Sequence, residues 1–311
     1  MAPGATSTGM TDETYDRRLT IRILSLFLAS SVFLPAQTPK PLTAREAIAL
    51  IQQHSGVSWA GDTVDTIKAG NPDTPVTGVA TAMMATLDVL KKAAAENANF
   101  VITHEPTFYS HTDTTEPFQA ANDAVWREKE KFIQEHHMVV WRFHDHWHRM
   151  KPDGILRGVA DALQWEGNES VTDPNLFVLP RTTVRDLART IQQRIGIKTI
   201  RVVGDPNLQV SQIALMPGAA GPQRHLPMLR RDDVEVLVIG EVPEWETIEY
   251  VSDAASEGRH KALILMGHVQ SEEAGMAYCA AWLKTFIPDV PVRFVPTPDL
   301  YWQPAQAPSV P

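Results

Sequence analysis

The chain has a single cysteine among 311 residues, Cys279, and it lies in an alanine-rich segment. One thiol cannot form a disulfide within the chain, and it cannot supply a structural zinc site built from several cysteines. Unpaired cysteines are among the most buried residue types, so we expect Cys279 to be a small residue of the core.

The sequence also lacks a dense block of lysine and arginine. It has 28 basic residues against 37 acidic ones, a formal charge of −9 and a pI near 5.6. Such a chain does not attract a polyanion, so no nucleic-acid partner is expected. With 43% hydrophobic and 21% charged residues, its composition is that of an ordinary globular protein. The length suits one large domain or two of usual size.

The apolar run at 23–35 is too short to cross a membrane. It follows Arg17, Arg18 and Arg22 and precedes Ala36, a small residue suited to cleavage. We therefore expect residues 1–36 to be a signal peptide and the protein to be exported, to the periplasm or outside the cell. The alternative is a disordered tail with a hydrophobic patch, which would leave the protein in the cytoplasm. No cysteine follows the run, so neither a lipoprotein anchor nor any other stable membrane anchor is expected.

Strand-like and helix-like segments alternate along the rest of the chain, which indicates the α/β class. Residues 78–86, 87–96 and 100–103 predict a strand–helix–strand unit with two parallel strands and a right-handed crossover. Further strands are expected at 138–143, 176–179, 197–203, 210–216, 234–239, 262–266 and 292–295. Further helices are expected at 44–53, 116–137, 155–164, 184–195, 244–257 and 271–286.

Histidines and carboxylates follow three of the predicted strands. The segments are Thr-His-Glu-Pro at 103–106, His-Asp-His-Trp-His at 144–148, and Gly-His-Val-Gln-Ser-Glu at 267–272. Ligands of open α/β sheets bind beyond the carboxyl ends of the strands, so the three segments could converge. One histidine at a strand end is more often a hydrogen-bonded loop residue than a ligand, and 144–148 alone could be a solvated loop. Three such segments in equivalent positions favour a metal site.

His268 and Glu272 are four residues apart, which places both side chains on one face if a helix has begun by then. Imidazole and carboxylate donors without thiolates suit divalent Zn, Mn, Fe or Co. Two adjacent ions would need a bridging group, and Glu105 and Glu272 are available. Five histidines outside these segments are expected at the surface: His111, His136, His137, His225 and His260.

These motifs resemble the NIF-three-like family, the dinuclear-metal-centre proteins named GTP cyclohydrolase I type 2 homologues. The segment at 103–106 resembles the family's Thr-His-His-Pro, and 144–148 resembles its His-Thr-Asn-Leu-Asp. The segment at 267–272 matches the family's Gly-His-x-x-Ser-Glu, and 218–221 stands where the family has a glycine-rich turn. The resemblance covers about residues 43–300.

The resemblance implies a NIF-three-like fold of two α/β lobes with mixed, largely parallel sheets. Residues 37–170 together with 234–300 would form the metal-site lobe, 171–233 the second lobe, and 301–311 a loose proline-rich tail. It also implies a homo-oligomer, a hexamer in the family, and a small-molecule substrate.

Carried over by position, the implied metal ligands are His104, Glu105, His148, His268 and Glu272. Relative to the family, one histidine is replaced by Glu105 and one aspartate by His148, and this paired exchange keeps the ligand charge at −2. Asp145 is an alternative ligand in place of His148. Trp245 stands where the family has a further histidine near the site, so a possible proton shuttle is absent.

Two functions follow from this resemblance. The first is a metal-dependent hydrolase with two divalent ions, in which His144 orients a ligand or carries a proton. The family name implies opening of a guanine-nucleotide ring, but export argues against GTP as the substrate. The second is a non-catalytic metal-binding or regulatory protein whose function is its assembly.

Overall fold

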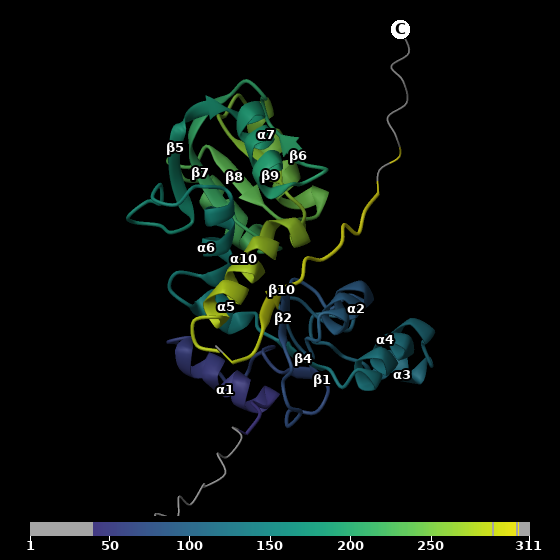
Figure 1. Cartoon of the computed structure of the whole chain (residues 1–311). Helices are drawn as coiled ribbons and strands as arrows, with labels where there is room; N and C mark the ends of the chain where they lie inside the picture. Colours follow the sequence, from purple (N-terminus) through teal and green to yellow (C-terminus); the bar gives the residue numbers. More distant parts are fainter. Residues whose placement is uncertain (1–39, 288, 303, 305–311) are drawn as a thin grey trace, which may run out of the picture. The chain divides into compact units, whose positions relative to one another are not determined.

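Two five-stranded sheets organise the chain, and parallel strands form the centre of each (Figure 1). The computed structural model describes residues 40–287, 289–302 and 304. The predicted signal peptide, 1–36, lies outside the described residues, as does most of the predicted tail. The described residues from Pro41 onward form one packing unit. Among the described residues, no helix has the length and apolar character needed to span a membrane.

The first sheet has the order β1-β4-β3-β2-β10. Its strands are β1 (Ile67–Ala69), β2 (Val79–Ala82), β3 (Phe100–Thr103), β4 (Val139–Arg142) and β10 (Val292–Phe294). β2, β3 and β4 are buried at every residue, as expected for parallel strands covered on both faces. The predicted strand–helix–strand unit is confirmed, with α2 (Leu87–Ala95) joining the parallel β2 and β3. β1 was not predicted, and it pairs antiparallel with β4 at the edge.

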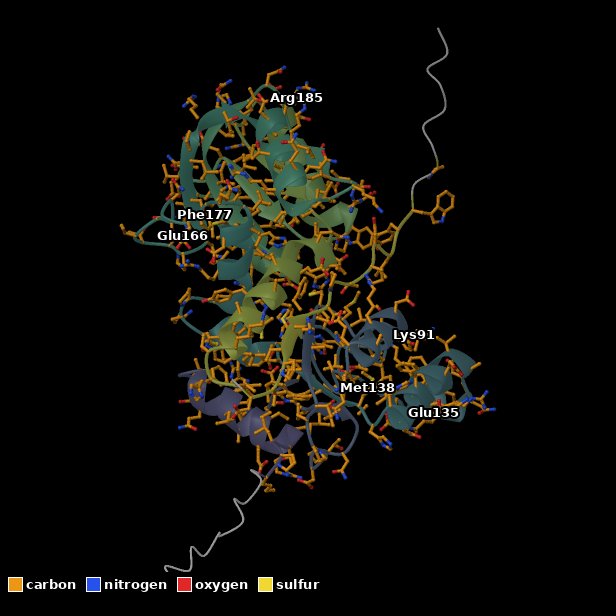
Figure 2. The ribbon with its side chains drawn as sticks, viewed as in Figure 1. Lys91, Glu135, Met138, Glu166, Phe177 and Arg185 are labelled. Carbon is orange, nitrogen blue, oxygen red and sulfur yellow. The ribbon has the colours of Figure 1, made fainter. Side chains whose placement is uncertain are left out.

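The second sheet has the order β5-β7-β8-β9-β6. Its strands are β5 (Leu176–Thr183), β6 (Arg201–Val203), β7 (Gln209–Met216), β8 (Val236–Ile239) and β9 (Ala262–Leu265). β8 and β9 lie in the segment that the resemblance assigns to the metal-site lobe, and in this sheet β8 pairs parallel with both β7 and β9. Figure 2 shows Phe177 on β5 and Glu166 in the loop that precedes it.

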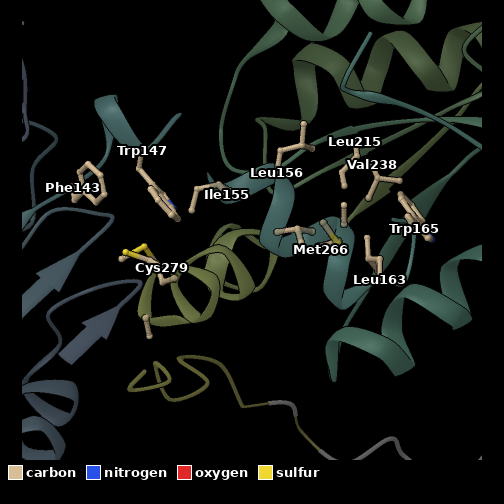
Figure 3. Close-up of a cluster of buried hydrophobic side chains, with 14 of the residues drawn as sticks. Phe143, Trp147, Ile155, Leu156, Leu163, Trp165, Leu215, Val238, Met266 and Cys279 are labelled. Carbon is tan, nitrogen blue, oxygen red and sulfur yellow. The ribbon is translucent and has the colours of Figure 1, made fainter. Parts of the chain in front are cut away.

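Two central helices join the sheets, α6 (Gly154–Ala162) and α10 (His268–Leu283). They approach closely through glycines: a Cβ on Gly158 would lie 2.6 Å from the Ala274 carbonyl oxygen, and one on Gly275 would lie 2.6 Å from the Ile155 Cα. One buried hydrophobic cluster runs from the first sheet through both helices to the second (Figure 3). Cys279 is fully buried in it on α10, which confirms its predicted place in the core.

The remaining helices cover the two sheets. α1 (Ala44–His54) begins at a Thr43 capping box, and α7 (Val184–Ile195) ends at the left-handed Gly196, as predicted. The predicted helix at 116–137 is divided into α3 (Glu116–Ala120) and α4 (Ala124–Glu135), with Asp123 capping the second. The others are α5 (Asp145–Arg149), α8 (Pro222–Leu229), the π-helix at Glu244–Ile248 and α9 (Glu249–Ser256).

Candidate metal centre

The three histidine-bearing segments meet at one place in the fold. His104 and Glu105 follow β3, and His144 follows β4 with His148 one turn later on α5. The rings of His104, His144 and His148 are mutual neighbours, with centroids 4.5, 4.9 and 5.0 Å apart. The predicted convergence of the first two segments is thus present, and it follows from the parallel pairing of β3 with β4.

α10 brings the third segment to the same place. It begins at His268, three residues earlier than predicted, so His268 and Glu272 lie on one face with Nε2 and Oε2 3.2 Å apart. His268 Nε2 is also 3.3 Å from Glu105 Oε1, and Glu272 Oε2 is 3.6 Å from His104 Nε2. The carboxylates of Glu105 and Glu272 therefore lie between imidazoles from different segments.

Two groups of side chains have the geometry of a metal site. His104, His144 and His148 form one group, and His104, Glu105 and Glu272 form the other. In each group one donor atom per residue lies within 4.8 Å of the others. His104 belongs to both groups, so the two possible positions adjoin each other.

Each of the four imidazoles is held by a hydrogen bond at Nδ1. The acceptor for His104 is the Phe143 carbonyl at 3.3 Å, and the other three rings bond to carboxylates. The pairs are His144 with Asp145 at 3.0 Å, His148 with Asp153 at 2.9 Å and His268 with Glu241 at 2.9 Å. An acceptor at one ring nitrogen fixes the ring and leaves the other nitrogen free to bind a metal.

Two buried donor atoms of the cluster have no hydrogen-bond partner among the described residues. They are His104 Nε2 and Glu272 Oε2, on side chains that are 0% and 4% exposed. Buried polar atoms are nearly always satisfied, and a ligand bound between these two would satisfy both. A nitrogen lone pair and a carboxylate oxygen facing one another fit a divalent cation.

The charges of the cluster are strongly coupled. Burial, with the nearby His148 and His144, holds the pKa of His104 well below its ordinary value. Burial opposes protonation of His268 too, but the carboxylates of Glu105 and Glu272, 3.3 and 3.2 Å from its Nε2, raise its pKa to about 11. The carboxylates of Glu105 and Glu272 thus favour a positive charge between them, here that of the His268 imidazolium.

The structure places Asp145 behind His144 instead of beside the other donors. Its carboxylate accepts hydrogen bonds from the Thr63 hydroxyl at 2.8 Å and the Val64 amide at 3.2 Å. Despite partial burial, the bonds to His144, Thr63 and Val64 lower the pKa of Asp145 to about 2. It belongs to neither donor group, whereas His148 belongs to one.

Gly218, which follows β7, and Ser271, which lies on α10, also contact residues of the cluster. A side chain on Gly218 would collide with the Glu272 carboxylate, and its φ of +76° also favours glycine. The Ser271 hydroxyl accepts a hydrogen bond from the Gly218 amide at 2.9 Å and donates to the His268 carbonyl at 2.8 Å. Glycine at position 218 of the predicted turn therefore allows the chain to pass close to the Glu272 carboxylate.

Several residues at the site were not singled out from the sequence. Asp153 uses one oxygen to hold His148 and the other to cap α6 at Ile155, 2.8 Å away. Its place before Gly154 was a visible capping signal. Glu241 holds His268 through Nδ1, whereas Trp245 is 76% exposed.

Two histidines have structural roles. His146, inside the 144–148 segment, is buried between the Asp65 carboxylate at 2.7 Å and the Ala60 amide at 2.9 Å. The prediction that His225 lies at the surface is wrong, because α8 buries it against Thr247, 3.0 Å from the hydroxyl. The other four predicted surface histidines are exposed: His111, His136, His137 and His260.

A cavity of about 650 Å³ opens beside the cluster. Glu105, His144, His148, His268 and Glu272 line one part of it. Its size is that of a small-molecule site. The donor groups can therefore be reached by a small molecule.

Comparisons with known proteins were made for the whole chain. The profile of the family described as Duf34/NIF3 (NGG1p interacting factor 3) matches residues 43–299. A Clostridium acetobutylicum protein named GTP cyclohydrolase 1 type 2 homolog is 23% identical over 217 residues, 66% of this chain and 76% of the relative. A Chlamydia pneumoniae protein of the same name is 25% identical over 251 residues, 74% and 88% of the two chains.

Solved structures share the fold at low sequence identity. The crystal structure of a Staphylococcus aureus hypothetical protein is similar with a TM-score of 0.66 at 16% identity, covering 85% of this chain and 100% of that one. A Bacillus cereus protein related to NIF3 is similar with a TM-score of 0.64 at 14% identity, covering 85% and 99%. The two-sheet architecture is thus the fold of these proteins.

Proposed function

The chain belongs to the Duf34/NIF3 family, and we propose that it binds two divalent metal ions and uses them to hydrolyse a small-molecule substrate. One observation carries the proposal: His104 Nε2 and Glu272 Oε2 face each other, buried and without a partner, among further histidines and carboxylates. A metal ion satisfies both atoms at once.

The residues that would hold the ions come from three segments. His104, Glu105 and Glu272 would serve one position, with His268 beside the two carboxylates. His104, His144 and His148 would serve the other. The five ligands expected from the family resemblance are included, and His144 joins them. Zn, Mn, Fe and Co all suit such donors.

Divalent ions held by these donors would acidify water and polarise an oxygen atom of the substrate. The chain's own part is to keep the donors fixed. Asp145, Asp153 and Glu241 each hold one imidazole through Nδ1, which sets the tautomer that leaves Nε2 as the donor atom. The side chain of His144 is 22% exposed and lines the cavity, which places it to carry a proton between substrate and solvent.

The substrate is proposed only as a class. The relatives carry the name GTP cyclohydrolase 1 type 2 homolog, which suggests hydrolysis of a ring amide or amidine. If residues 1–36 direct export, as proposed from the sequence, GTP itself would be scarce at the protein's location. A phosphoester or cyclic amide hydrolase fits both considerations. A homo-oligomer, as in the family, is part of the same proposal.

Metal content and turnover test the proposal together. Full-length protein is loaded with Zn or Mn, passed through a desalting column and measured by elemental analysis, with two ions per chain expected. Glu272→Gln and His104→Asn should each lose metal, and His136→Asn, at an exposed histidine on the C-cap of α4, is the matched control. Hydrolysis is then measured on a panel of phosphoesters and cyclic amides.

The outcomes separate the two functions. Metal-dependent turnover lost in Glu272→Gln supports the hydrolase. Metal binding without turnover on any member of the panel supports a non-catalytic metal-binding protein. A wild-type chain that retains no metal would refute both. A His144→Gln variant that keeps its metal but loses turnover would identify His144 as a proton carrier instead of a ligand.

A further inference from the structure

The cavity beside the metal cluster is also lined by apolar side chains. Leu156 of α6, Phe177 of β5 and Pro217 also line it, and Figure 2 shows Phe177 on the second sheet. An apolar wall with a few polar groups is typical of a small-molecule pocket, and the volume excludes a folded polymer as its occupant. The chemistry of the occupant therefore depends on those polar groups.

Four basic side chains line the same cavity. Arg157 is neutralised by Asp161 at 2.8 Å and by Glu166 at 2.5 Å. Arg149, Lys151 and Arg224 form no ion pair with a carboxylate within the described part of the chain. Three basic side chains of the cavity lining thus have no ion-pair partner among the described residues.

The carboxylates of the cavity are engaged elsewhere. Asp145 and Asp153 are bonded to His144 and His148, and Glu105 is bonded to Arg142 at 3.0 Å. Glu169 accepts a hydrogen bond from the Gly167 amide at 2.8 Å. Within the described residues, none of these four carboxylates forms an ion pair with Arg149, Lys151 or Arg224.

Arg224 is the free cation most closely tied to the metal cluster. It lies in the first turn of α8, just after the turn at 218–221. That turn is anchored to the cluster, because the Gly218 amide donates to Ser271 and Gly218 lies against Glu272. Arg224 and His148 line the same cavity. Arg224 is solvent-exposed, so a ligand can reach its guanidinium.

We infer that the substrate of the metal centre is a small anionic molecule whose carboxylate or phosphate group is bound by Arg224, with Arg149 and Lys151 contributing positive potential. The inference rests on the proposed function, since it takes the cavity to be the substrate site. A guanidinium pairs with carboxylate and phosphate through two parallel hydrogen bonds, so it selects an oxyanion over a neutral group. With its anionic group there, the body of the molecule contacts the apolar wall and its hydrolysable group faces the histidines.

Binding of three aromatic probes tests the inference. Phenyl phosphate, phenylacetate and the neutral 2-phenylethanol are titrated into metal-loaded full-length protein by calorimetry. We expect at least one anion to bind about tenfold or more tightly than 2-phenylethanol. Arg224→Gln should weaken that anion about tenfold, equivalent to about 1.4 kcal/mol. The stronger of the two anions identifies phosphate or carboxylate as the recognised group.

The control variant lies on the same helix. Arg230→Gln changes an exposed arginine at the C-cap of α8, outside the cavity lining, and should leave anion binding unchanged. Elemental analysis of every variant keeps the two proposals apart. A wild type without metal overturns the proposed function. Full metal content with equal anion affinity in wild type and Arg224→Gln, or with 2-phenylethanol bound as tightly as the anions, overturns the anion site alone.

Discussion

The guanidinium of Arg142 lies 3.0 Å from the carboxylate of Glu105. Arg142 is fully buried at the end of β4, and it also donates to the carbonyls of His104 at 3.0 Å and His111 at 2.6 Å. Burial alone would raise the pKa of Glu105, but His268 and Arg142 together lower it. The carboxylate that stands in place of a family histidine therefore has a built-in counter-charge.

Removing Arg142 should destabilise the protein. Arg142→Met leaves the half-buried Glu105 without its cation and two carbonyls without a donor, so we expect a loss of about 3 kcal/mol in the free energy of unfolding. Arg142→Lys should recover less than half of it, because the three donors of an ammonium share one nitrogen and cannot reach the separated acceptors that the three guanidinium nitrogens meet. Urea denaturation of metal-free protein measures both.

A double-mutant cycle with Glu105→Gln isolates the pair. If the ion pair carries the effect, Arg142→Met costs less in the Glu105→Gln background than in the wild type. Equal costs in both backgrounds would show that the carbonyl contacts, and not Glu105, account for the stability.

Asp153 should affect metal affinity and stability through different oxygens. Asp153→Asn keeps a good helix cap for α6 but replaces the carboxylate that holds His148, so we expect metal affinity to fall about tenfold with little change in stability. Asp153→Ala should lose the same affinity and about 1 kcal/mol of unfolding free energy as well. Chelator competition and urea denaturation give the two quantities. Equal stability losses in the two variants would contradict the separation of roles.

The paired exchange at Glu105 and His148 can be reversed by mutation. Preservation of the ligand charge predicts that Glu105→His with His148→Asp retains metal better than either single change. The structure adds a condition: the double variant leaves Arg142 without Glu105 and puts a second carboxylate beside Asp153. We therefore expect it to bind metal about tenfold more weakly than the wild type, and to recover when Arg142→Gln and Asp153→Asn are added. A double variant with wild-type affinity would exclude a role for these two neighbours.

The convergence of the site was predictable because it depends on local signals. The apolar strands at 100–103 and 139–142 are visible in the sequence, and a connection of the βαβ type makes strands parallel. Parallel strands end at the same edge, so His104 and His144 had to be neighbours. The helical spacing of His268 and Glu272 gave the third segment its geometry.

Other features depend on contacts that sequence patterns do not contain. β8 and β9 are apolar strands that either sheet could accept, and only their register with β7 decides. β1 is three residues in a polar loop, held by pairing with β4. The sequence also does not reveal which carboxylate meets which histidine, so Asp153 and Glu241 had no visible link to His148 and His268.

His225 was placed at the surface because two prolines, at 222 and 227, concealed α8, and its burial makes the protein acid-sensitive. Burial and the nearby Arg224 lower the pKa of His225 from 6.5 to about 4. Between these pH values the unfolded chain binds a proton at this residue and the folded chain does not, so the unfolded state is favoured by acid. The contribution of His225 is therefore complete above pH 6.5 and is lost as the pH falls toward 4, with an upper limit of about 3 kcal/mol.

In His225→Gln the contribution is absent, so the stability advantage of the metal-free wild type over the variant should shrink across this range. Urea denaturation at pH 7, 5.5 and 4.5 measures the difference, in which the titration of the other histidines cancels. A difference that stays constant with pH would show that His225 does not titrate in this way.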